Sequence, residues 1–250
     1  MGAKDMQQTI LQVKDLCKKY SAKADYAVQN VTFDCAAGEV VGILGHNGAG
    51  KSTTLKCLEG MIPFDKGEIS VCGFDVKTQA VQAKSNMGFV TDDHAVFVNM
   101  TGLQYLEFMC DVYKVPAGER QNRLEQLQQI LDLGDSVYDV ISSYSHGMKQ
   151  KICMMGSLMH RPKLWILDEP MTGLDPVTMR SVLQFMRSYV SHGNAILFSS
   201  HDLNVVAKVC DRVVMLRKGK QLLNLDVAVQ KAQDPNFDFE EYFLAHEAKN

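Results

Sequence analysis

The chain has 250 residues, of which 46% are hydrophobic and 22% are charged, as in an ordinary globular protein with one large α/β domain or two small ones. Its formal net charge is -3 and it has no long cluster of Lys and Arg, which argues against a nucleic-acid-binding surface. The seven cysteines are scattered and never spaced C-x-x-C, which argues against a disulfide framework or a zinc site and indicates a reducing compartment.

The first part of the chain is predicted to form strands of two kinds. Leu11–Leu16 and Val31–Cys35 alternate apolar and polar residues, which is typical of strands with one exposed face. Val40–Leu44 is instead a short apolar run closed by a glycine, which indicates a strand buried on both faces. A helix is expected directly after this strand, from about Lys51 through Leu58.

Residues 90–160 are predicted to be mainly helical. Apolar residues recur there at helical spacing in two groups: Leu103, Leu106, Met109 and Cys110, and then Leu124, Leu127, Ile130 and Leu131. An all-helical segment inserted into an α/β core indicates a subdomain. The uncharged stretch Ile152–His160 is less than half of a membrane span, which needs about 20 residues, so we expect a soluble chain in the cytoplasm.

The C-terminal part of the chain is predicted to return to strands. Leu164–Leu167 and Ala195–Phe198 are two more short apolar runs of the buried kind. Arg212–Leu216 and Gln221–Leu223 flank a Lys-Gly-Lys turn and should form a closing hairpin. The tail 235–250 places three aromatic residues on one face of a short acidic helix: Phe239, Tyr242 and Phe243.

Each of the three buried strands is followed by polar residues. These are Gly45–Ser52 after the first strand, Asp168 and Glu169 after the second, and Ser199, Ser200 and His201 after the third. In doubly wound α/β sheets, ligands bind beyond the carboxyl ends of the strands. The three strand ends therefore predict a single site.

The segment Gly45–Ser52 matches the phosphate-loop pattern G-x-x-x-x-G-K-[ST]. Gly48 and Gly50 allow the backbone to wrap closely around phosphate oxygens, so that its N–H groups point inward. Lys51 adds a positive charge near the β- and γ-phosphates, and the Ser52 hydroxyl is a ligand for Mg²⁺. The pattern predicts that the chain binds Mg-ATP through Gly45, His46, Asn47, Gly48, Ala49, Gly50, Lys51, Ser52 and Thr53.

The second and third strand ends carry the candidate catalytic groups. Asp168 is placed to hold the hydration shell of Mg²⁺, and Glu169 to orient or deprotonate the attacking water. An isolated Asp-Glu pair is more often a solvated turn, and a lone histidine is more often structural. At the end of a third core strand, however, His201 becomes a candidate sensor of the γ-phosphate.

These motifs in this order resemble the nucleotide-binding subunit of ABC transporters over nearly the whole chain. The segment 144–150, Tyr-Ser-His-Gly-Met-Lys-Gln, is similar to the family signature L-S-G-G-Q. The resemblance implies that Ser145 and Gly147 contact the γ-phosphate held by another subunit. Ser145 also precedes a helical stretch and would serve equally as a simple helix N-cap, and both roles can hold together.

Further positions match the family one at a time. Tyr20 stands where the family has an aromatic residue that stacks on adenine, although a tyrosine at a strand end would also be ordinary packing. Asp175 lies in a segment similar to the loop that couples two sites across a dimer, and it otherwise reads as a helix cap before Pro176. His201 matches the switch histidine of the family.

Three departures from the family pattern stand out. His46 replaces the usual proline of the phosphate loop, a position that contributes backbone. His146 and Met148 replace a glycine and the glutamine of the signature, which resembles a subclass found in many exporters. Asp92 replaces the glutamine that touches Mg²⁺, so the predicted metal-site residues are Ser52, Asp92 and Asp168.

The resemblance implies a fold, a partner and a function. The expected fold is α/β, with a phosphate-loop (RecA-like) core, an antiparallel β subdomain and an inserted α-helical subdomain. Residues 1–225 would form the ABC ATPase domain, with the helical subdomain at about 90–160, and residues 226–250 a short C-terminal helical tail. The chain would work with a second ATP-binding subunit, as a homodimer or a heterodimer, on the cytoplasmic face of a membrane that holds a separate permease.

The expected function is ATP hydrolysis that powers a membrane exporter of a drug, peptide, lipid or polysaccharide. Residues 101–115 resemble the helical region of such exporters. Two alternatives remain open at this point. One is a soluble ABC ATPase that acts on ribosomes or DNA, and the other is a regulatory nucleotide-binding protein that does not hydrolyse ATP.

Overall fold

The structure is a computed structural model that describes residues 8–92, 97–234 and 237–248. Its strands are β1 (Thr9–Lys18), β2 (Val28–Ala36), β3 (Val40–Leu44), β4 (Lys66–Val71), β5 (Phe74–Asp75), β6 (Met87–Val90), β7 (Leu164–Asp168), β8 (Ala195–Ser200), β9 (Arg212–Arg217) and β10 (Lys220–Asp226). Within these ranges the strands form one sheet in the order β5-β4-β1-β2-β10-β9-β3-β8-β7-β6. The chain therefore has the predicted mixed α/β architecture.

The sheet has an antiparallel part and a parallel part. β5, β4, β1 and β2 pair antiparallel, whereas β9, β3, β8, β7 and β6 pair parallel to one another. The three strands predicted to be buried, β3, β8 and β7, are direct neighbours in the parallel part. Because they are parallel, their carboxyl ends meet at the same edge of the sheet, as the sequence predicts.

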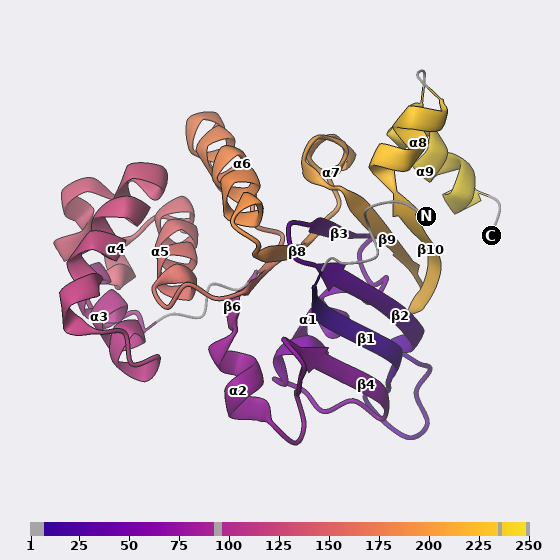
Figure 1. The fold of residues 1–250 in the computed structure, drawn as a ribbon, viewed down its shortest axis with the longest axis horizontal. Helices are drawn as coiled ribbons and strands as arrows, with labels where there is room; N and C mark the ends of the chain where they lie inside the picture. Colours follow the sequence, from indigo (N-terminus) through magenta and orange to yellow (C-terminus); the bar gives the residue numbers. More distant parts are fainter. Residues whose placement is uncertain (1–7, 93–96, 235–236, 249–250) are drawn as a thin grey trace.

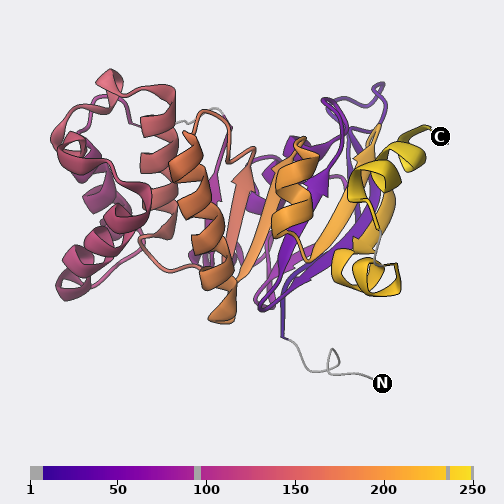
Figure 2. The ribbon, with the colours of Figure 1, turned by 90° about the horizontal axis from the view of Figure 1, so that it is seen from above.

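The helices are α1 (Lys51–Glu59), α2 (Ala80–Ser85), α3 (Gly102–Val112), α4 (Ala117–Leu131), α5 (His146–Leu158), α6 (Pro176–Ser191), α7 (Leu203–Val209), α8 (Val227–Gln233) and α9 (Phe239–Ala248). Helices α3, α4 and α5 gather at one end of the molecule, while the antiparallel strands lie towards the other end together with α8 and α9 (Figures 1 and 2). No helix in the described ranges has both the length and the apolar character needed to cross a bilayer.

Two hydrophobic cores lie on opposite faces of the parallel strands, because alternate residues of a strand point to opposite faces. In β7, Trp165 and Leu167 join the core that contains α3 to α7, whereas Leu164 and Ile166 join the core that contains α1. β8 alternates in the same way, with Ile196 and Phe198 on one side and Ala195 and Leu197 on the other. Burial on both faces explains why these strands are short apolar runs rather than alternating ones.

His160, just after the end of α5, contacts both β6 and the end of α3. Its Nε2 atom lies 2.9 Å from the carbonyl oxygen of Met87 at the start of β6, and its ring stacks on Tyr113 with the ring centroids 3.7 Å apart. The pKa of His160 is lowered to about 4, chiefly by burial; the hydrogen bond to Met87 raises the pKa and the charge of Arg123 lowers it. The neutral imidazole is therefore the form that the fold holds.

We expect the free energy of unfolding to fall as the pH drops from about 6.5 towards 4, because the unfolded chain then binds a proton that folded His160 does not. The loss due to this group should reach about 2 kcal/mol at pH 5. Urea unfolding at pH 7.5 and pH 5.0 measures it, in the wild type and in His160→Gln. The variant should show the smaller pH effect, whereas the exposed His192→Gln should behave like the wild type; equal pH effects in all three would contradict this role.

Candidate functional site

The phosphate loop connects β3 to α1 and is held tightly by two other segments. A Cβ atom on Gly50, which has φ +106°, would lie 2.7 Å from the carbonyl oxygen of Ala27 in the β1–β2 connection. A Cβ atom on Gly45 would lie 2.3 Å from the carbonyl oxygen of Leu216 in β9. The loop thus needs glycine at these positions because neighbouring backbone approaches it closely.

Positive charge gathers at the mouth of this loop. The Lys51 ammonium group is largely buried; it donates a hydrogen bond of 2.7 Å to the carbonyl oxygen of Gly45 and lies 3.7 Å from Oε1 of Glu169. Helix α1 begins here without a side-chain cap, so its first N–H groups are not occupied by a capping side chain. A lysine beside the N-terminus of a helix forms a binding site for an anion such as a phosphate group.

Asp168 ends β7 and is 1% exposed. Its Oδ1 atom accepts a 2.5 Å hydrogen bond from the Ser199 hydroxyl, but none of the described residues gives the buried Oδ2 atom a hydrogen bond of ordinary geometry. Burial raises the pKa of Asp168, and the negative charges of Asp92 and Glu169 raise it further, while the hydroxyls of Ser199 and Ser52 lower it. A buried carboxylate oxygen that lacks a well-formed hydrogen bond, among other carboxylates and near a hydroxyl, fits an oxygen-seeking cation such as Mg²⁺.

Within the described ranges, no three His, Cys, Asp or Glu side chains are grouped so as to hold a metal by themselves. This arrangement is still compatible with Mg²⁺, which binds through one or two carboxylates together with the phosphates of its substrate and several waters.

Glu169 follows Asp168 directly and is held at three points. Its Oε2 atom lies 2.9 Å from Nδ1 of His201, and its backbone N–H donates to the Ser199 hydroxyl at 3.1 Å. Its Oε1 atom faces Lys51. The residue has φ +48°, a left-handed conformation that is uncommon for glutamate and that these contacts maintain. Glu169 therefore faces the phosphate loop in a defined orientation.

A cleft of about 370 Å³ opens over the loop. It is lined by Tyr20, Ala27, His46, Asn47, Gly48, Gly50, Lys51, Ser52, Thr53, Asp92 and Glu169. The structure thus brings together most of the predicted nucleotide- and metal-site residues, including Tyr20, whose hydroxyl lies 3.1 Å from Thr53 Oγ1. Asp168 lies next to this cleft through Ser52, and His201 through Glu169.

Ser145, Gly147 and Asp175 lie elsewhere and are not among the residues that line the cleft. Ser145 caps α5 by accepting a hydrogen bond from the N–H of Met148, and Asp175 caps α6 by accepting from Val177 and Thr178. A Cβ atom on Gly147 would lie 2.5 Å from the carbonyl oxygen of Gly173, so the first turn of α5 packs directly on the loop between β7 and α6. These predicted residues form a second group, separate from the phosphate loop of the same chain.

His46 has a packing role that its position in the loop does not suggest. Its ring makes an edge contact with Phe243 of α9, with the ring centroids 6.2 Å apart. Phe243 and Phe239 are both buried. The C-terminal helix therefore packs against the phosphate loop.

Two residues that orient the site were named in the sequence analysis without being given that role. Ser199 holds both Asp168 and the backbone of Glu169, and Gln150, which is 1% exposed, donates a 2.9 Å hydrogen bond from Nε2 to the carbonyl oxygen of Pro170. A serine at the end of an apolar strand indicates a polar group at the predicted site. Its partner could not be predicted, because the register of β8 on β7 places Ser199 opposite Asp168.

A phosphate loop that faces an acidic strand end across parallel strands defines a phosphate-loop nucleotide-binding protein. A family model described as ABC transporter matches residues 28–172. The linearmycin resistance ATP-binding protein LnrL of Bacillus subtilis is 32% identical over 213 residues, which cover 85% of this chain and 68% of that protein. The methionine import ATP-binding protein MetN of Clostridium acetobutylicum is 30% identical over 217 residues, covering 84% of this chain and 67% of that protein.

The fold agrees with these similarities. A solved ATP-binding subunit of an ABC transporter is 28% identical and superimposes with a TM-score of 0.89, covering 96% of this chain and all of that one. The chain belongs to the ABC transporter family, as an ATP-binding subunit with ATPase activity.

Proposed function

We propose that the chain hydrolyses Mg-ATP at the phosphate loop, as one of two ATP-binding subunits that drive export through a separate permease. The observation that carries the hydrolytic part is the position of Glu169, whose carboxylate lies between Lys51 and His201 at the open side of the loop. The left-handed backbone conformation of Glu169, held beside the phosphate loop, supports a catalytic role for its carboxylate.

In the proposed reaction, the N–H groups of the loop and Lys51 bind the β- and γ-phosphates. Water attacks the γ-phosphorus while the bond to the ADP oxygen breaks, and Glu169 accepts the proton that the water loses. His201 holds Oε2 of Glu169 and senses the γ-phosphate. Ser52, Asp92 and Asp168 would hold Mg²⁺, directly or through water, and the ion would neutralise charge that develops on the phosphate oxygens.

The remaining predicted residues support a site shared between two subunits. Ser145 and Gly147 at the start of α5 offer a hydroxyl and a helix N-terminus to an anion, yet they lie outside the cleft of their own chain. We place them, with Asp175, opposite the phosphate loop of a second ATP-binding subunit. Tyr20, which is 63% exposed, would stack on the adenine.

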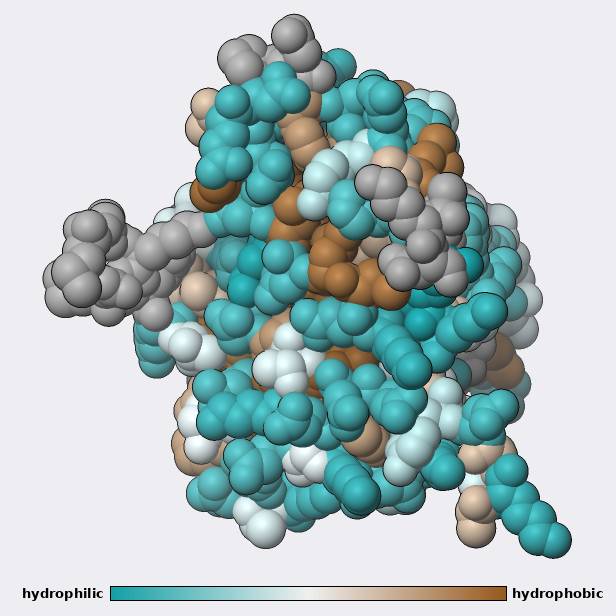
Figure 3. Space-filling model, turned by 90° about the vertical axis from the view of Figure 1, so that its right-hand side faces the viewer, coloured by the Kyte–Doolittle hydropathy of each residue, from teal (hydrophilic) through white to brown (hydrophobic). Residues whose placement is uncertain are grey.

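A group of exposed apolar side chains supports contact with a permease. Phe97, Val98, Phe108 and Val112 are exposed, and the rings of Phe97 and Phe108 contact each other edge to face at 5.2 Å. Exposed apolar groups of this kind often mark an interaction surface. The face that carries α8, α9 and β10 is mainly hydrophilic, with a narrow hydrophobic strip (Figure 3). Through its contact with the permease, the subunit would lie on the cytoplasmic face of the membrane. Residues 1–225 would form its ATPase domain and 226–250 a tail.

The proposed direction, export, rests on the similarity to LnrL, a resistance protein, and on the resemblance of residues 101–115 to exporters. The similarity to MetN, an import protein, makes this direction a matter for experiment. The complex should be purified from membranes with its permease and reconstituted so that the ATP-binding subunits face outwards. An exporter then concentrates a fluorescent drug or phospholipid inside the vesicles when ATP is added outside; release of the same compound from preloaded vesicles, driven by ATP added outside, would overturn the proposal.

The unusual residue Asp92 gives a further prediction. If Asp92 contacts the ion through water, Asp92→Ala should lower the rate of ATP hydrolysis roughly 10- to 100-fold, the usual effect of losing a partner around a metal ligand. The rate is measured in the assembled transporter at saturating ATP. The exposed Asp135→Ala, at the distant helical end, is the matched control, and an unchanged rate in Asp92→Ala would refute the role.

A further inference from the structure

A second cleft, larger than the one over the phosphate loop, lies between α4, α6 and the turn that leads from α5 into β7. Its volume is about 480 Å³, which is within the range of pockets that hold small organic ligands. Lys163 and Asn194, at its rim, directly precede β7 and β8. The cleft is therefore at the edge of the sheet opposite the phosphate loop, and it belongs to neither the site nor the permease surface described above.

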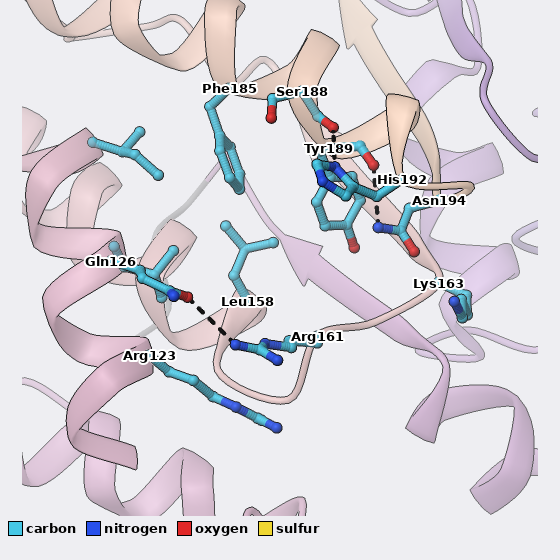
Figure 4. Close-up of a pocket in the computed structure, with 12 residues that line it drawn as sticks. Arg123, Gln126, Leu158, Arg161, Lys163, Phe185, Ser188, Tyr189, His192 and Asn194 are labelled. Atoms are coloured by element: carbon cyan, nitrogen blue, oxygen red, sulfur yellow. Dashed lines mark hydrogen bonds between the residues drawn. The ribbon is translucent and has the colours of Figure 1, made fainter. Parts of the chain in front are cut away.

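The floor of this cleft is apolar and firmly packed. Leu158, Phe185 and Tyr189 line it, and Figure 4 shows Leu158 and Phe185 directed into the space between α4 and α6. The Tyr189 hydroxyl donates to the carbonyl oxygen of Pro162, and its ring lies against Phe185 with the centroids 5.8 Å apart. These contacts fix the floor, so an apolar ligand would meet a preformed surface.

The rim of the cleft is cationic. Arg123, Arg161 and Lys163 line it, and its lining includes no Asp or Glu, although the whole chain has a net charge of -3. Arg123 is paired with Glu119, one turn earlier on α4. The Arg161 side chain donates a 3.4 Å hydrogen bond to the neutral Gln126. Within the described ranges, neither Arg161 nor Lys163 forms an ion pair. The Arg161 guanidinium group and the Lys163 ammonium group are thus available to an anion beside the apolar floor.

We propose that this cleft binds a small anionic amphiphile: one phosphate or carboxylate group, held by Arg161 and Lys163, on an apolar body that covers Leu158 and Phe185. The volume suits a single chain or ring system. Because α4 belongs to the helical group and α6 packs on the sheet, such a ligand would bridge the two parts of the protein.

The chain carries its own reporter for this site. Trp165 is the single tryptophan, and its ring packs edge-on against Phe185, with the centroids 5.8 Å apart, and lies 5.9 Å from Tyr189. A ligand on the floor of the cleft should therefore change the tryptophan fluorescence. Octyl phosphate, octanol and inorganic phosphate are titrated separately, with ADP at saturation so that the phosphate loop is occupied.

We expect octyl phosphate to bind at least tenfold more tightly than either octanol or inorganic phosphate, because it alone engages both the rim and the floor. The double variant Arg161→Gln, Lys163→Gln should lose this preference and bind octyl phosphate about as weakly as octanol. The charge-matched double variant Lys208→Gln, Lys220→Gln should bind like the wild type, and an unchanged ADP affinity shows that each variant is folded. Equal affinities for octyl phosphate and octanol in the wild type, or equal losses in both double variants, would overturn the proposal.

Discussion

Replacing Glu169 by glutamine is expected to stop ATP hydrolysis while ATP remains bound. The amide keeps the size of the side chain and its position between Lys51 and His201, but it cannot accept a proton from water. General-base catalysis contributes about 10²- to 10⁴-fold, and the rate should fall by that factor. Phosphate release measures turnover, and binding of labelled ATP on the same sample shows that the site remains filled.

This variant also tests the shared site. Without hydrolysis, ATP should hold two subunits together, so the Glu169→Gln protein should elute as a dimer with ATP and as a monomer without it. Glu68→Gln, an exposed glutamate on the antiparallel strand β4, is the matched control and should keep wild-type turnover. Wild-type turnover in Glu169→Gln would rule out its role as the base.

Replacing Lys51 by methionine should remove most of the ATP affinity. The ammonium group is buried and is held against the carbonyl oxygens of the loop. Without it, the phosphate oxygens would meet only the backbone N–H groups of the loop. Truncating one partner of a buried, hydrogen-bonded charge pair costs about 2–5 kcal/mol, which corresponds to a roughly 30- to 5,000-fold weaker affinity. Titration with a fluorescent ATP analogue measures the change.

Lys56→Met is the control for this prediction, because Lys56 lies on the same helix α1 but does not line the cleft. It should bind the analogue like the wild type. Thermal unfolding of both variants without nucleotide separates a loss of affinity from a loss of folding. Equal affinity in Lys51→Met and the wild type would show that the loop binds phosphate through its backbone alone.

The elements that could be predicted are those whose local sequence pattern is compatible with a single type of structure. Val40–Leu44, Leu164–Leu167 and Ala195–Phe198 were predicted as buried strands, and the structure contains them as β3, β7 and β8 with at most two residues added. The helix after the phosphate loop begins at Lys51, where it was expected. Burial on both faces demands apolar residues at every position, so these strands are visible in the sequence.

The strand β4 was not predicted, because its sequence Lys-Gly-Glu-Ile-Ser-Val has only two buried apolar side chains, Ile69 and Val71. It is a strand because β1 supplies its hydrogen-bonding partner, with Leu11 opposite Val71. Such a segment gains most of its stability from pairing, which a local pattern does not contain.

The sequence by itself determined the chemistry of the nucleotide site, because the spacing of Gly, Lys and Ser in the loop and the acids after a buried strand specify which groups meet a phosphate. Tertiary structure alone decided how those groups are held: Ser199 reaches Asp168 through the register of β8 on β7, and Phe243 reaches His46 from the far end of the chain. It also created the cationic cleft, since Arg123 on α4 and Arg161 after α5 share a rim only once α4, α5 and α6 pack together. Contacts between residues distant in the chain follow from packing and strand pairing, which no local pattern encodes.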